Sequence, residues 1–551
     1  MMFSSTARGR WRLPATVEQL ILAASLFWAF SANGLFLGAT LKDRTLAEPN
    51  TWLFAGALMV MLTSLHYVLL ALVSNRYTVK PILALLIVGT AFASHFMQSF
   101  GVYLDPSMLR NVMRTDVAEA RELFAWRLIP HLLLFAALPL LVLWRVRLVK
   151  RPWLRAGLVR LGTVVLATMF FVGALLSVFQ SFSSLMRNNK DIRYLVTPGN
   201  YLWSIGAVVA AETKGAAKPR QAIGLDAAPG PRMAARSKPL VVVLVVGETA
   251  RAANWGLNGY SRQTTPELAK LSVINFPQVT ACGTNTEVSL PCMFAPVGRR
   301  DYDESRIRGS ESLLHVVARA GVGVHWRDNQ SGCKGVCEGL PQDEVLALNP
   351  PGLCQDGRCL DEGLLAGLDE RLAKLKGGRA TQLLVLHQLG NHGPSYFRRY
   401  PSSFARFAPA CQKDDLHKCS REEITAAYDN ALLYTDHVLA SLISKLQAAS
   451  SDVDSAVVYV SDHGESLGEN NLYLHGLPYA IAPDLQKQVP MVAWFSAGAP
   501  ASLGLDTTCL QARAQKPTAH DHLFHTLLAL LDVKTNLYER DWDLTQACRQ
   551  P

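Results

Sequence analysis

The sequence predicts a protein of two parts: an N-terminal membrane domain of five transmembrane helices, and an α/β domain outside the membrane, in which helices cover a central, mostly parallel sheet. Three observations predict this fold class. Long apolar blocks crowd the first 180 of the 551 residues, all ten cysteines follow residue 281, and short apolar runs alternate with helical patterns after about residue 238. A chain of this length exceeds one ordinary hydrophobic core. We therefore expect a membrane anchor over 1–180, a connector and linker over 181–237, and an exported domain over 238–551.

Five apolar blocks predict the membrane helices. They cover about residues 18–40, 51–74, 81–103, 128–144 and 158–180. Each comes close to the ~20 residues that cross a bilayer as a helix. Basic residues crowd their alternate flanks: Arg8, Arg10, Arg12, Arg76, Lys80, Arg145, Arg147, Lys150, Arg151, Arg155 and Arg160. Basic loops of this kind stay in the cytoplasm. We therefore predict that everything after about residue 180 lies outside, and so does the 101–127 loop, in which acidic residues alternate with the arginines. The first block lacks a convincing cleavage site, which predicts an uncleaved anchor.

The cysteines fall as close neighbours in the exported part. The neighbours are Cys282 and Cys292, Cys333 and Cys337, Cys354 and Cys359, and Cys411 and Cys419, which leaves Cys509 and Cys548. An even number of loop-closing cysteines in an exported domain indicates disulfides. A cytosolic zinc-knuckle cluster is the alternative, but CxxC pairs with a proper partner spacing are missing. Spacing does not prove the pairing, and Cys509 with Cys548 follows only by elimination.

The charge balance and the connector carry weaker signals. The formal net charge is +10, which the basic inner loops partly explain through topology and anionic lipid headgroups. No basic helix with interleaved aromatic residues is evident, so we expect no nucleic-acid partner. The start of the connector mixes apolar and charged residues at helical spacing, which predicts an amphipathic helix on the membrane surface. Its remainder is rich in Ala, Gly, Pro and basic residues and is predicted to be a linker.

Short apolar runs predict the strands of the exported domain. The clearest are PLVVVLVVGE, GVGVHWRD, TQLLVLHQLGNHG, SAVVYVSDHGE and VPMVAWFSA. Strands that are apolar on both faces are typical of a parallel sheet covered by helices. Residues 422–447 have the pattern of an amphipathic helix that precedes one of these strands. In such a sheet, ligands bind outside the carboxyl ends of the strands.

Several of these runs end in residues that can bind a metal. They are Glu248, His387, His392, Asp462, His463 and His475. One histidine near a strand end is more often a hydrogen-bonded structural residue than a ligand. Carboxylates and imidazoles at successive strand ends together indicate a metal site, because each buried charge needs a partner there. A mixed Asp, Glu and His set is what Zn²⁺ accepts, although Mn²⁺ is also tolerated.

The stretch ACGTNTEVSLPCMF, residues 281–294, supplies candidate nucleophiles. A disulfide between its two cysteines would close a short loop and hold a hydroxyl rigidly against a metal. The metal would lower the pKa of that hydroxyl and make it a nucleophile. Thr284, Thr286 and Ser289 all qualify on chemistry. A hydroxyl-rich surface loop without catalytic function is the alternative for this motif taken alone.

Five separated motifs carry a resemblance to a known family. They are GETARAANWGLNGYSRQTTP, CGTNTEVSLPCMF, WRDNQSGCKGVC, LHQLGNHGPSYFRRYP and SDHGESLGENNLYLHGLPYAIAP. In this order the chain resembles the lipid A phosphoethanolamine transferases, the polymyxin-resistance enzymes of the alkaline phosphatase superfamily. The resemblance implies an alkaline-phosphatase/sulfatase-like fold for the exported domain, which would lie in the periplasm of a bacterium, and a multi-pass anchor in the inner membrane. We expect a monomer.

The resemblance also implies roles for individual residues. Thr286 matches the nucleophile, which becomes a phosphothreonine carrying phosphoethanolamine. The matches to a tight zinc site are Glu248, Thr286, Asp462 and His463. His392 and His475 match histidines that bind the substrate phosphate or a second, looser zinc. Lys334 matches a lysine near the phosphate.

Further matches concern the donor lipid. Asn111, Thr115 and Glu119 recur every four residues in the outward loop, so on a helix they form one polar stripe. By spacing alone this is a solvated helix face, whereas the resemblance implies a contact with the donor headgroup. Ser331 and His387 lie near matched positions and are kept as supporting residues. Glu287 departs from the pattern, because many relatives carry a small residue directly after the nucleophile.

The implied reaction transfers phosphoethanolamine from phosphatidylethanolamine to a phosphate of lipid A, releases diacylglycerol and confers polymyxin resistance. The alternatives are transfer to core sugars or another periplasmic glycan, and a metal-stabilised sensor domain without turnover. A sulfatase would need a C/S-x-P-x-R maturation motif, but Cys292 is followed by Met-Phe-Ala. A glycerol-phosphate polymerase shares the five-span anchor and the threonine, but the cysteines and the NHGP and DHGE motifs favour phosphoethanolamine transfer.

Overall fold

The computed structural model describes residues 13–549 except 43, 116, 125 and 217–219. The predicted basic flank at Arg8, Arg10 and Arg12 lies outside the described residues. The chain forms two compact units. One comprises Met1–Pro106 and Ala125–Ala207, and the other comprises Ser107–Phe124 and Val208–Pro551. The second unit carries the candidate site. It also includes Ser107–Phe124, which is part of the loop between two membrane helices.

The first unit contains the predicted membrane helices. Among the described residues, four helices are long and apolar enough to cross a membrane: α3 (Pro49–Val73), α4 (Val79–Phe100), the continuous segment Leu128–Arg145, and α9 (Trp153–Ser177). A fifth span results if the bent pair α1 (Val17–Ser31) and α2 (Gly34–Leu41) is counted as one. The segment Leu128–Arg145 comprises α7 (Leu128–Leu132), a π-helical turn over Leu133–Ala137 and α8 (Leu138–Arg145). These helices confirm the predicted N-terminal membrane anchor.

The second unit is built on an eight-stranded sheet with the order β15-β5-β14-β11-β4-β10-β6-β7. The strands are β4 (Leu240–Gly247), β5 (Ile274–Thr280), β6 (Gly323–Asp328), β7 (Gln342–Glu344), β10 (Thr381–His387), β11 (Asp454–Ser461), β14 (Gln488–Phe495) and β15 (Thr518–Ala519). Of the eight described strands, only β14 runs antiparallel to both of its neighbours. The mostly parallel sheet was therefore predicted correctly, but the parallel direction expected for VPMVAWFSA was wrong, because an apolar run reports burial on both faces and not direction.

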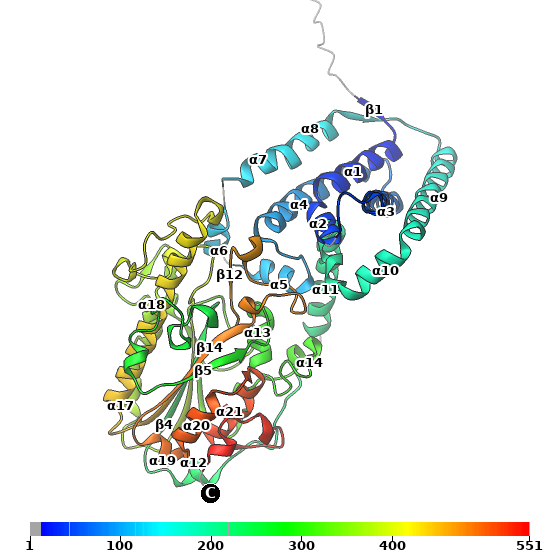
Figure 1. The fold of residues 1–551 in the computed structure, drawn as a ribbon. Coiled ribbons are helices and arrows are strands. Elements are labelled where there is room, and N and C mark those ends of the chain that lie inside the picture. Colours follow the sequence, from blue (N-terminus) through cyan, green and yellow to red (C-terminus); the bar gives the residue numbers. More distant parts are fainter. Residues whose placement is uncertain (1–12, 43, 116, 125, 217–219, 550–551) are drawn as a thin grey trace, which may run out of the picture. The chain divides into compact units, whose positions relative to one another are not determined.

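Both faces of the sheet are buried, and β4 shows why its sequence is continuously apolar. Leu240, Val242, Leu244 and Val246 point into one core, whereas the residues between them point into the other. Helices α15 (Leu313–Arg319) and α21 (Asp521–Leu531) cover the first face. Helices α17 (Leu368–Leu375) and α18 (Arg421–Ala448) cover the second. Figure 1 shows α18 and α21 on opposite sides of the sheet.

Helix α18 is the amphipathic helix that the sequence predicts over 422–447. It begins at Arg421 because Ser420 and Glu423 form a capping box, in which each side chain bonds to the backbone of the other. The smaller elements of this unit are α14 (Glu304–Gly309), α16 (Val345–Leu348), α19 (Ala499–Leu503), α20 (Thr507–Ala514), β8 (Cys354–Gln355), β9 (Arg358–Cys359), β12 (Ser466–Leu467) and β13 (Tyr473–Leu474).

The connector contains more structure than a flexible linker. It forms α10 (Phe179–Asn188), a 3-10 helix over Lys190–Leu195 and α11 (Gly199–Ala216). The predicted linker contributes β3 (Ala228–Pro229), which pairs with β16 (Val533–Lys534), and α12 (Pro231–Ala235). Residues 228–235 of the predicted linker thus carry regular structure and belong to the second unit, where Arg232 donates to Leu503 O at 2.9 Å.

All ten cysteines form disulfides within the second unit, and none is free. The pairs are Cys282–Cys292, Cys333–Cys337, Cys354–Cys359, Cys411–Cys419 and Cys509–Cys548. The last pair joins residues separated by 39 positions and ties the C-terminus to α20. Cross-links of this kind stabilise a folded domain mainly by restricting the unfolded chain.

Candidate active site

Two neighbouring strands place three possible metal ligands together. Glu248 follows β4, and Asp462 and His463 follow β11, which pairs in parallel with β4 so that Gly247 lies opposite Ser461. Their ligand atoms all lie within 4.8 Å of one another, and all three residues are fully buried. The parallel pairing of β4 and β11 brings the three residues together, because parallel strands have their carboxyl ends at the same edge of the sheet.

The charges of this cluster depend on one another. Burial raises the pKa of Glu248, but the hydrogen bond and charge of His463 outweigh burial and bring that pKa to about 2. Burial and the charge of Glu248 raise the pKa of Asp462 to about 7. Burial lowers the pKa of His463, but Asp462 and Glu248 outweigh it and raise the pKa to about 10. Two buried carboxylates therefore require a positive charge between them, which a proton on His463 or a metal cation supplies.

The atoms of the cluster fit a metal. Asp462 Oδ2 is buried and has no hydrogen-bond partner among the described residues. His463 Nδ1 lies 2.9 Å from Gly464 O, so Nδ1 carries a proton and Nε2 faces the cluster, 3.2 Å from Glu248 Oε1. Carboxylate oxygens together with an imidazole nitrogen are ligands that Zn²⁺ binds.

Thr286 is the hydroxyl residue that the structure brings to this cluster. Its Oγ1 donates to Glu248 Oε2 at 3.1 Å and lies 3.4 Å from His463 Nε2. It is the first residue of α13 (Thr286–Met293), whose N-cap Asn285 accepts a hydrogen bond from Val288 N. The helix N-terminus favours negative charge, as on an alkoxide or a phosphate bound at Thr286.

The other two candidate hydroxyls are used elsewhere. Thr284 Oγ1 donates to Leu477 O at 2.6 Å. Ser289 Oγ donates to Asp462 O and accepts from Gly283 N at 3.2 Å. Ser289 therefore joins the Cys282–Cys292 disulfide loop to the residue that follows β11. Neither Ser289 nor Thr284 occupies the position expected of the nucleophile.

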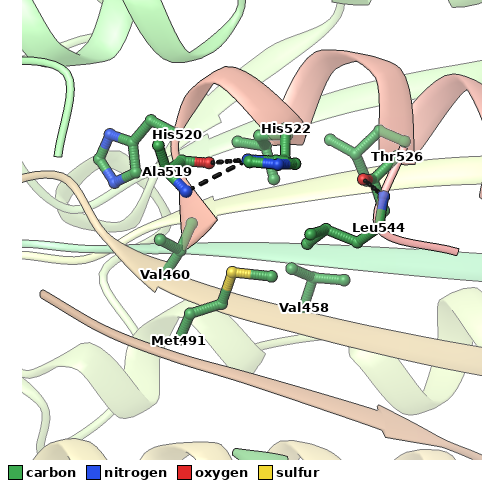
Figure 2. A pocket seen from close by; sticks show the side chains of 10 residues that line it. Val458, Val460, Met491, Ala519, His520, His522, Thr526 and Leu544 are labelled. Carbon is green, nitrogen blue, oxygen red and sulfur yellow. Dashed lines mark hydrogen bonds between the residues drawn. The ribbon is translucent and has the colours of Figure 1, made fainter. Parts of the chain in front are cut away.

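His520 provides a second link between this loop and β11. Its Nδ1 accepts from Cys282 N at 3.0 Å, and its Nε2 lies 3.0 Å from Ser461 O. Burial lowers the pKa of His520 to about 3, so the ring is neutral, accepts at Nδ1 and donates at Nε2. Figure 2 shows His520 at one end of an apolar pocket between β11, β14 and α21, next to His522. Sequence reasoning missed His520, because no motif marks a histidine that bonds only to backbone.

Replacing His520 by phenylalanine is expected to lower the thermal midpoint of the full-length protein by about 4–12 °C. The ring volume is kept, but Cys282 N and Ser461 O lose their partners, and a buried unsatisfied polar group costs about 1–3 kcal/mol. Thermal unfolding in detergent measures the shift. His522→Phe is the matched control, because the hydrogen bonds of His522 Nδ1 within the described part of the chain go to the nearby Ala519 and join no distant segments (Figure 2). Equal midpoints for the two variants would contradict the proposed link.

Two predicted histidines lie beside the cluster. The His475 ring is 4.3 Å from that of His463 and 5.4 Å from that of His392. Burial and the charge of His463 lower the pKa of His475 to about 3, so His475 is neutral. His475 Nδ1 lies 3.4 Å from Glu465, a fully buried carboxylate whose pKa burial raises to about 8. His475 and His392 therefore bring imidazole nitrogens next to the cluster, where they could bind a phosphate or a second metal.

The disulfide loop after β6 carries Lys334. Its Nζ donates to Ser331 O at 3.0 Å and to Ser331 Oγ at 2.5 Å, and it lies 3.6 Å from Glu287. Ser331 Oγ donates to Gln330 Oε1, and Gln330 Nε2 donates to Glu248 Oε2 at 3.3 Å. A chain of hydrogen bonds thus joins Lys334 to the cluster of Glu248, Asp462 and His463. Gln330 was missed from the sequence, because a single amide side chain forms no pattern.

His387 lies at the end of β10 and pairs with a carboxylate of the neighbouring strand. Its Nδ1 is 2.8 Å from Asp328 Oδ2, and Asp328 ends the neighbouring strand β6. Burial lowers the pKa of His387, but the charge and hydrogen bond of Asp328 outweigh it and raise the pKa. The loop after His387 packs against Glu248, since Asn391 N donates to Glu248 O, and a Cβ at Gly390 would lie 2.7 Å from that oxygen. Gly390 therefore permits this close approach.

The outward segment Ser107–Phe124 brings Glu119 to the site but does not form the expected stripe. Helix α5 (Pro106–Arg114) ends before Thr115, and α6 (Val117–Glu122) begins after it. Thr115 Oγ1 donates to Asn111 O, a local bond that competes with helix continuation. The single polar stripe of Asn111, Thr115 and Glu119 was therefore wrong as a helix geometry. Glu119 Oε1 lies 3.5 Å from His392 Nε2.

Two family models match the chain. A model described as sulfatase matches residues 241–533, and a model described as phosphoethanolamine transferase EptA/EptB matches residues 62–213. The first match contains Glu248, Thr286, Asp462 and His463. The second contains the outward segment and most of the membrane helices.

Whole-chain relatives agree with these matches. The chain is 37% identical over 535 residues to phosphoethanolamine transferase EptA of Salmonella typhimurium, with 96% of each protein covered. It is 37% identical to phosphatidylethanolamine transferase Mcr-1 of Escherichia coli, with 93% of this chain and 94% of Mcr-1 covered. A solved structure, the integral membrane protein lipooligosaccharide phosphoethanolamine transferase A (EptA) from Neisseria meningitidis, matches with a TM-score of 0.92 and 38% identity. That match covers 98% of this chain and 100% of the other.

Proposed function

Because this chain belongs to the phosphoethanolamine transferase family, as its motifs predict, we propose that it moves phosphoethanolamine from phosphatidylethanolamine to a phosphate of lipid A through Thr286. The observation that carries this proposal is the position of Thr286 Oγ1 between Glu248 and His463, at 3.1 and 3.4 Å. The name of Mcr-1 supports the donor, and that of the Neisseria enzyme supports a lipooligosaccharide acceptor.

We infer that the metal is zinc. Glu248, Asp462 and His463 would hold it together with the Thr286 oxygen, and His392 and His475 would hold a second, looser ion or the substrate phosphate. When bound, the ion lowers the pKa of the Thr286 hydroxyl and stabilises charge on the phosphate. The residues themselves orient the reaction: Glu248 and His463 hold Oγ1, and the N-terminus of α13 favours its negative charge.

In the donor half of the reaction, Thr286 Oγ1 attacks the phosphorus of phosphatidylethanolamine. The new Oγ1–P bond replaces the bond from phosphorus to the glycerol oxygen. Diacylglycerol leaves and takes up a proton in exchange for the one that Thr286 loses. Lys334, held by Ser331, stabilises the negative phosphate oxygens. Asn111, Thr115 and Glu119 contact the donor headgroup, with the Glu119 carboxylate available to the ethanolamine ammonium.

In the acceptor half, a phosphate oxygen of lipid A attacks the same phosphorus. A diphosphate bond forms, the Oγ1–P bond breaks, and Thr286 regains its proton. The product carries an ammonium group next to the lipid A phosphate, which weakens the attraction of cationic peptides such as polymyxins.

The location of the enzyme suits two lipid substrates. The chain is an inner-membrane protein with several spans, and its catalytic domain lies in the periplasm. We assign residues 1–180 to the anchor, 181–237 to the connector and 238–551 to the catalytic domain, which Ser107–Phe124 completes. The anchor keeps the site near the bilayer that holds the donor and the acceptor.

Mass spectrometry of lipid A from cells that express the protein tests the proposal. We expect lipid A species heavier by one phosphoethanolamine group, and none from cells that express Thr286→Ala. Fluorescent phosphatidylethanolamine added to the purified enzyme should release fluorescent diacylglycerol. Modification of core sugars with unchanged lipid A would redirect the acceptor, and the absence of diacylglycerol release would contradict the donor.

A further inference from the structure

A buried carboxylate lies directly beside the nucleophile. Glu287 is the second residue of α13, is 0% exposed and contacts three cations. Arg114 Nη1 lies 3.0 Å from its Oε2, Arg308 Nη2 lies 3.2 Å from the same atom, and Lys334 Nζ lies 3.6 Å from its Oε1. A buried carboxylate needs such partners, because an unpaired charge is costly away from water. Glu287 therefore points into the site's polar surroundings and not into solvent.

The three cations come from different parts of the second unit. Arg114 ends α5 of the outward segment, and Arg308 lies on α14. Arg308 also donates to Glu287 O, so it holds both the backbone and the side chain of this residue. Glu304 extends the network, because it pairs with Arg308 at 3.1 Å and with Arg110 of α5. Helix α5 is thus joined to the start of α13 by two charged routes.

Lys334 is the cation of this group that faces the reaction. Its ammonium group donates two hydrogen bonds to Ser331, and its third contact is with the carboxylate of Glu287. The Lys334 side chain is 3% exposed, so this orientation is set by protein atoms. Loss of the Glu287 charge would leave the Lys334 ammonium free to turn toward Ser331 alone.

We propose that Glu287 is a positioning residue that couples the donor-binding segment to the nucleophile: it holds α5 through Arg114 and aims Lys334 at the transferred phosphate. The proposal deepens the proposed transferase function and rests on it. Arg114 carries the part that concerns donor binding, because α5 also bears Asn111. Lys334 carries the part that concerns catalysis, because it stabilises the reacting phosphate.

A second set of ion pairs keeps the segment in place when this link is cut. Glu122 of α6 pairs with Arg399, and Arg358 Nε lies 2.9 Å from Glu122 Oε1. Arg399 Nε also donates to His392 O at 2.7 Å. Variants at Glu287 or Arg114 therefore change the orientation of α5 without releasing the whole segment.

Steady-state release of diacylglycerol from fluorescent phosphatidylethanolamine by the full-length enzyme tests the proposal. Arg114→Ala should raise KM about tenfold with kcat within about twofold, because it removes only donor binding. Glu287→Gln should raise KM similarly and also lower kcat about tenfold. The double variant should match Glu287→Gln, because the two residues act through one contact. Glu287→Asp, which keeps the charge, should recover most of kcat.

Arg306→Ala is the matched control. Arg306 lies on α14 beside Arg308, but its partner is the exposed Asp301, so its removal should leave both constants unchanged. If Glu287→Gln does not fold, Arg114→Ala and Glu287→Asp still decide the matter, since the Arg114 side chain is 38% exposed. Additive effects in the double variant, or unchanged constants in an active enzyme, would overturn the role of Glu287. A wild type that releases no diacylglycerol would overturn the transferase function, and this role with it.

Discussion

Replacing Thr286 by alanine is expected to lower diacylglycerol release at least about 10³-fold, because the nucleophile of a covalent mechanism is removed. The two other candidate hydroxyls of this loop are engaged in other hydrogen bonds. Thr284 is bonded to Leu477 O and Ser289 to Asp462 O, whereas Thr286 Oγ1 alone of the three contacts Glu248. Intact-protein mass spectrometry after incubation with the donor should show a phosphoethanolamine adduct on the wild type and none on Thr286→Ala.

Thr286→Ser is the matched variant for this experiment. Serine keeps the hydroxyl and loses only a methyl group, so the adduct should form again at a reduced rate. The alanine variant should keep its metal content and thermal midpoint, since Thr286 would supply only one of the four proposed ligands. Diacylglycerol release by Thr286→Ala at the wild-type rate would show that the phosphothreonine does not exist.

Replacing Asp462 by asparagine is expected to remove most of the bound zinc and to lower activity by more than the roughly 10–100-fold that loss of an outer partner costs. Asparagine keeps the size of the side chain and can still accept from Thr249 N, as Asp462 Oδ1 does at 3.3 Å. It lacks the negative charge that a zinc ion needs. Elemental analysis of the purified protein measures the metal independently of turnover.

Gln330→Ala is the comparison for Asp462→Asn, because Gln330 donates a hydrogen bond to Glu248 but is not one of the proposed ligands. We expect it to retain its metal and to lose about 10–100-fold in activity. Chelation should inactivate the wild type, and added Zn²⁺ should restore it. Full metal content and full activity in Asp462→Asn would mean that the ligands are wrongly assigned.

The sequence predicts those parts of the fold that follow from burial. The β4 run is apolar at every position because both faces of the strand are covered, and this follows from composition alone. The direction of β14 does not, since an antiparallel strand buried on both faces has the same apolar run. The pairing of β3 with β16 was missed because two residues are too few to form a pattern.

The sequence predicts those site residues that directly follow an apolar strand. Glu248 and Asp462 follow apolar runs, so parallel pairing alone brings them together. Gln330 and His520 could not be predicted, because each acts through a single contact with a group distant in the sequence. The break of the outward helix at Thr115 also depends on a local hydrogen bond that spacing does not reveal.

The assignment of Ser107–Phe124 to the catalytic unit has a consequence for inhibitor discovery. A soluble fragment that begins after residue 207 keeps Thr286 and the metal ligands. It loses Arg114, Glu119 and Glu122, so Arg399 is left without its carboxylate and Glu287 with one cation fewer. Compounds selected against such a fragment would be optimised for a site without the residues of Ser107–Phe124. Screening therefore calls for the full-length protein in detergent or nanodiscs, where molecules that contact α5 and α6 can also be found.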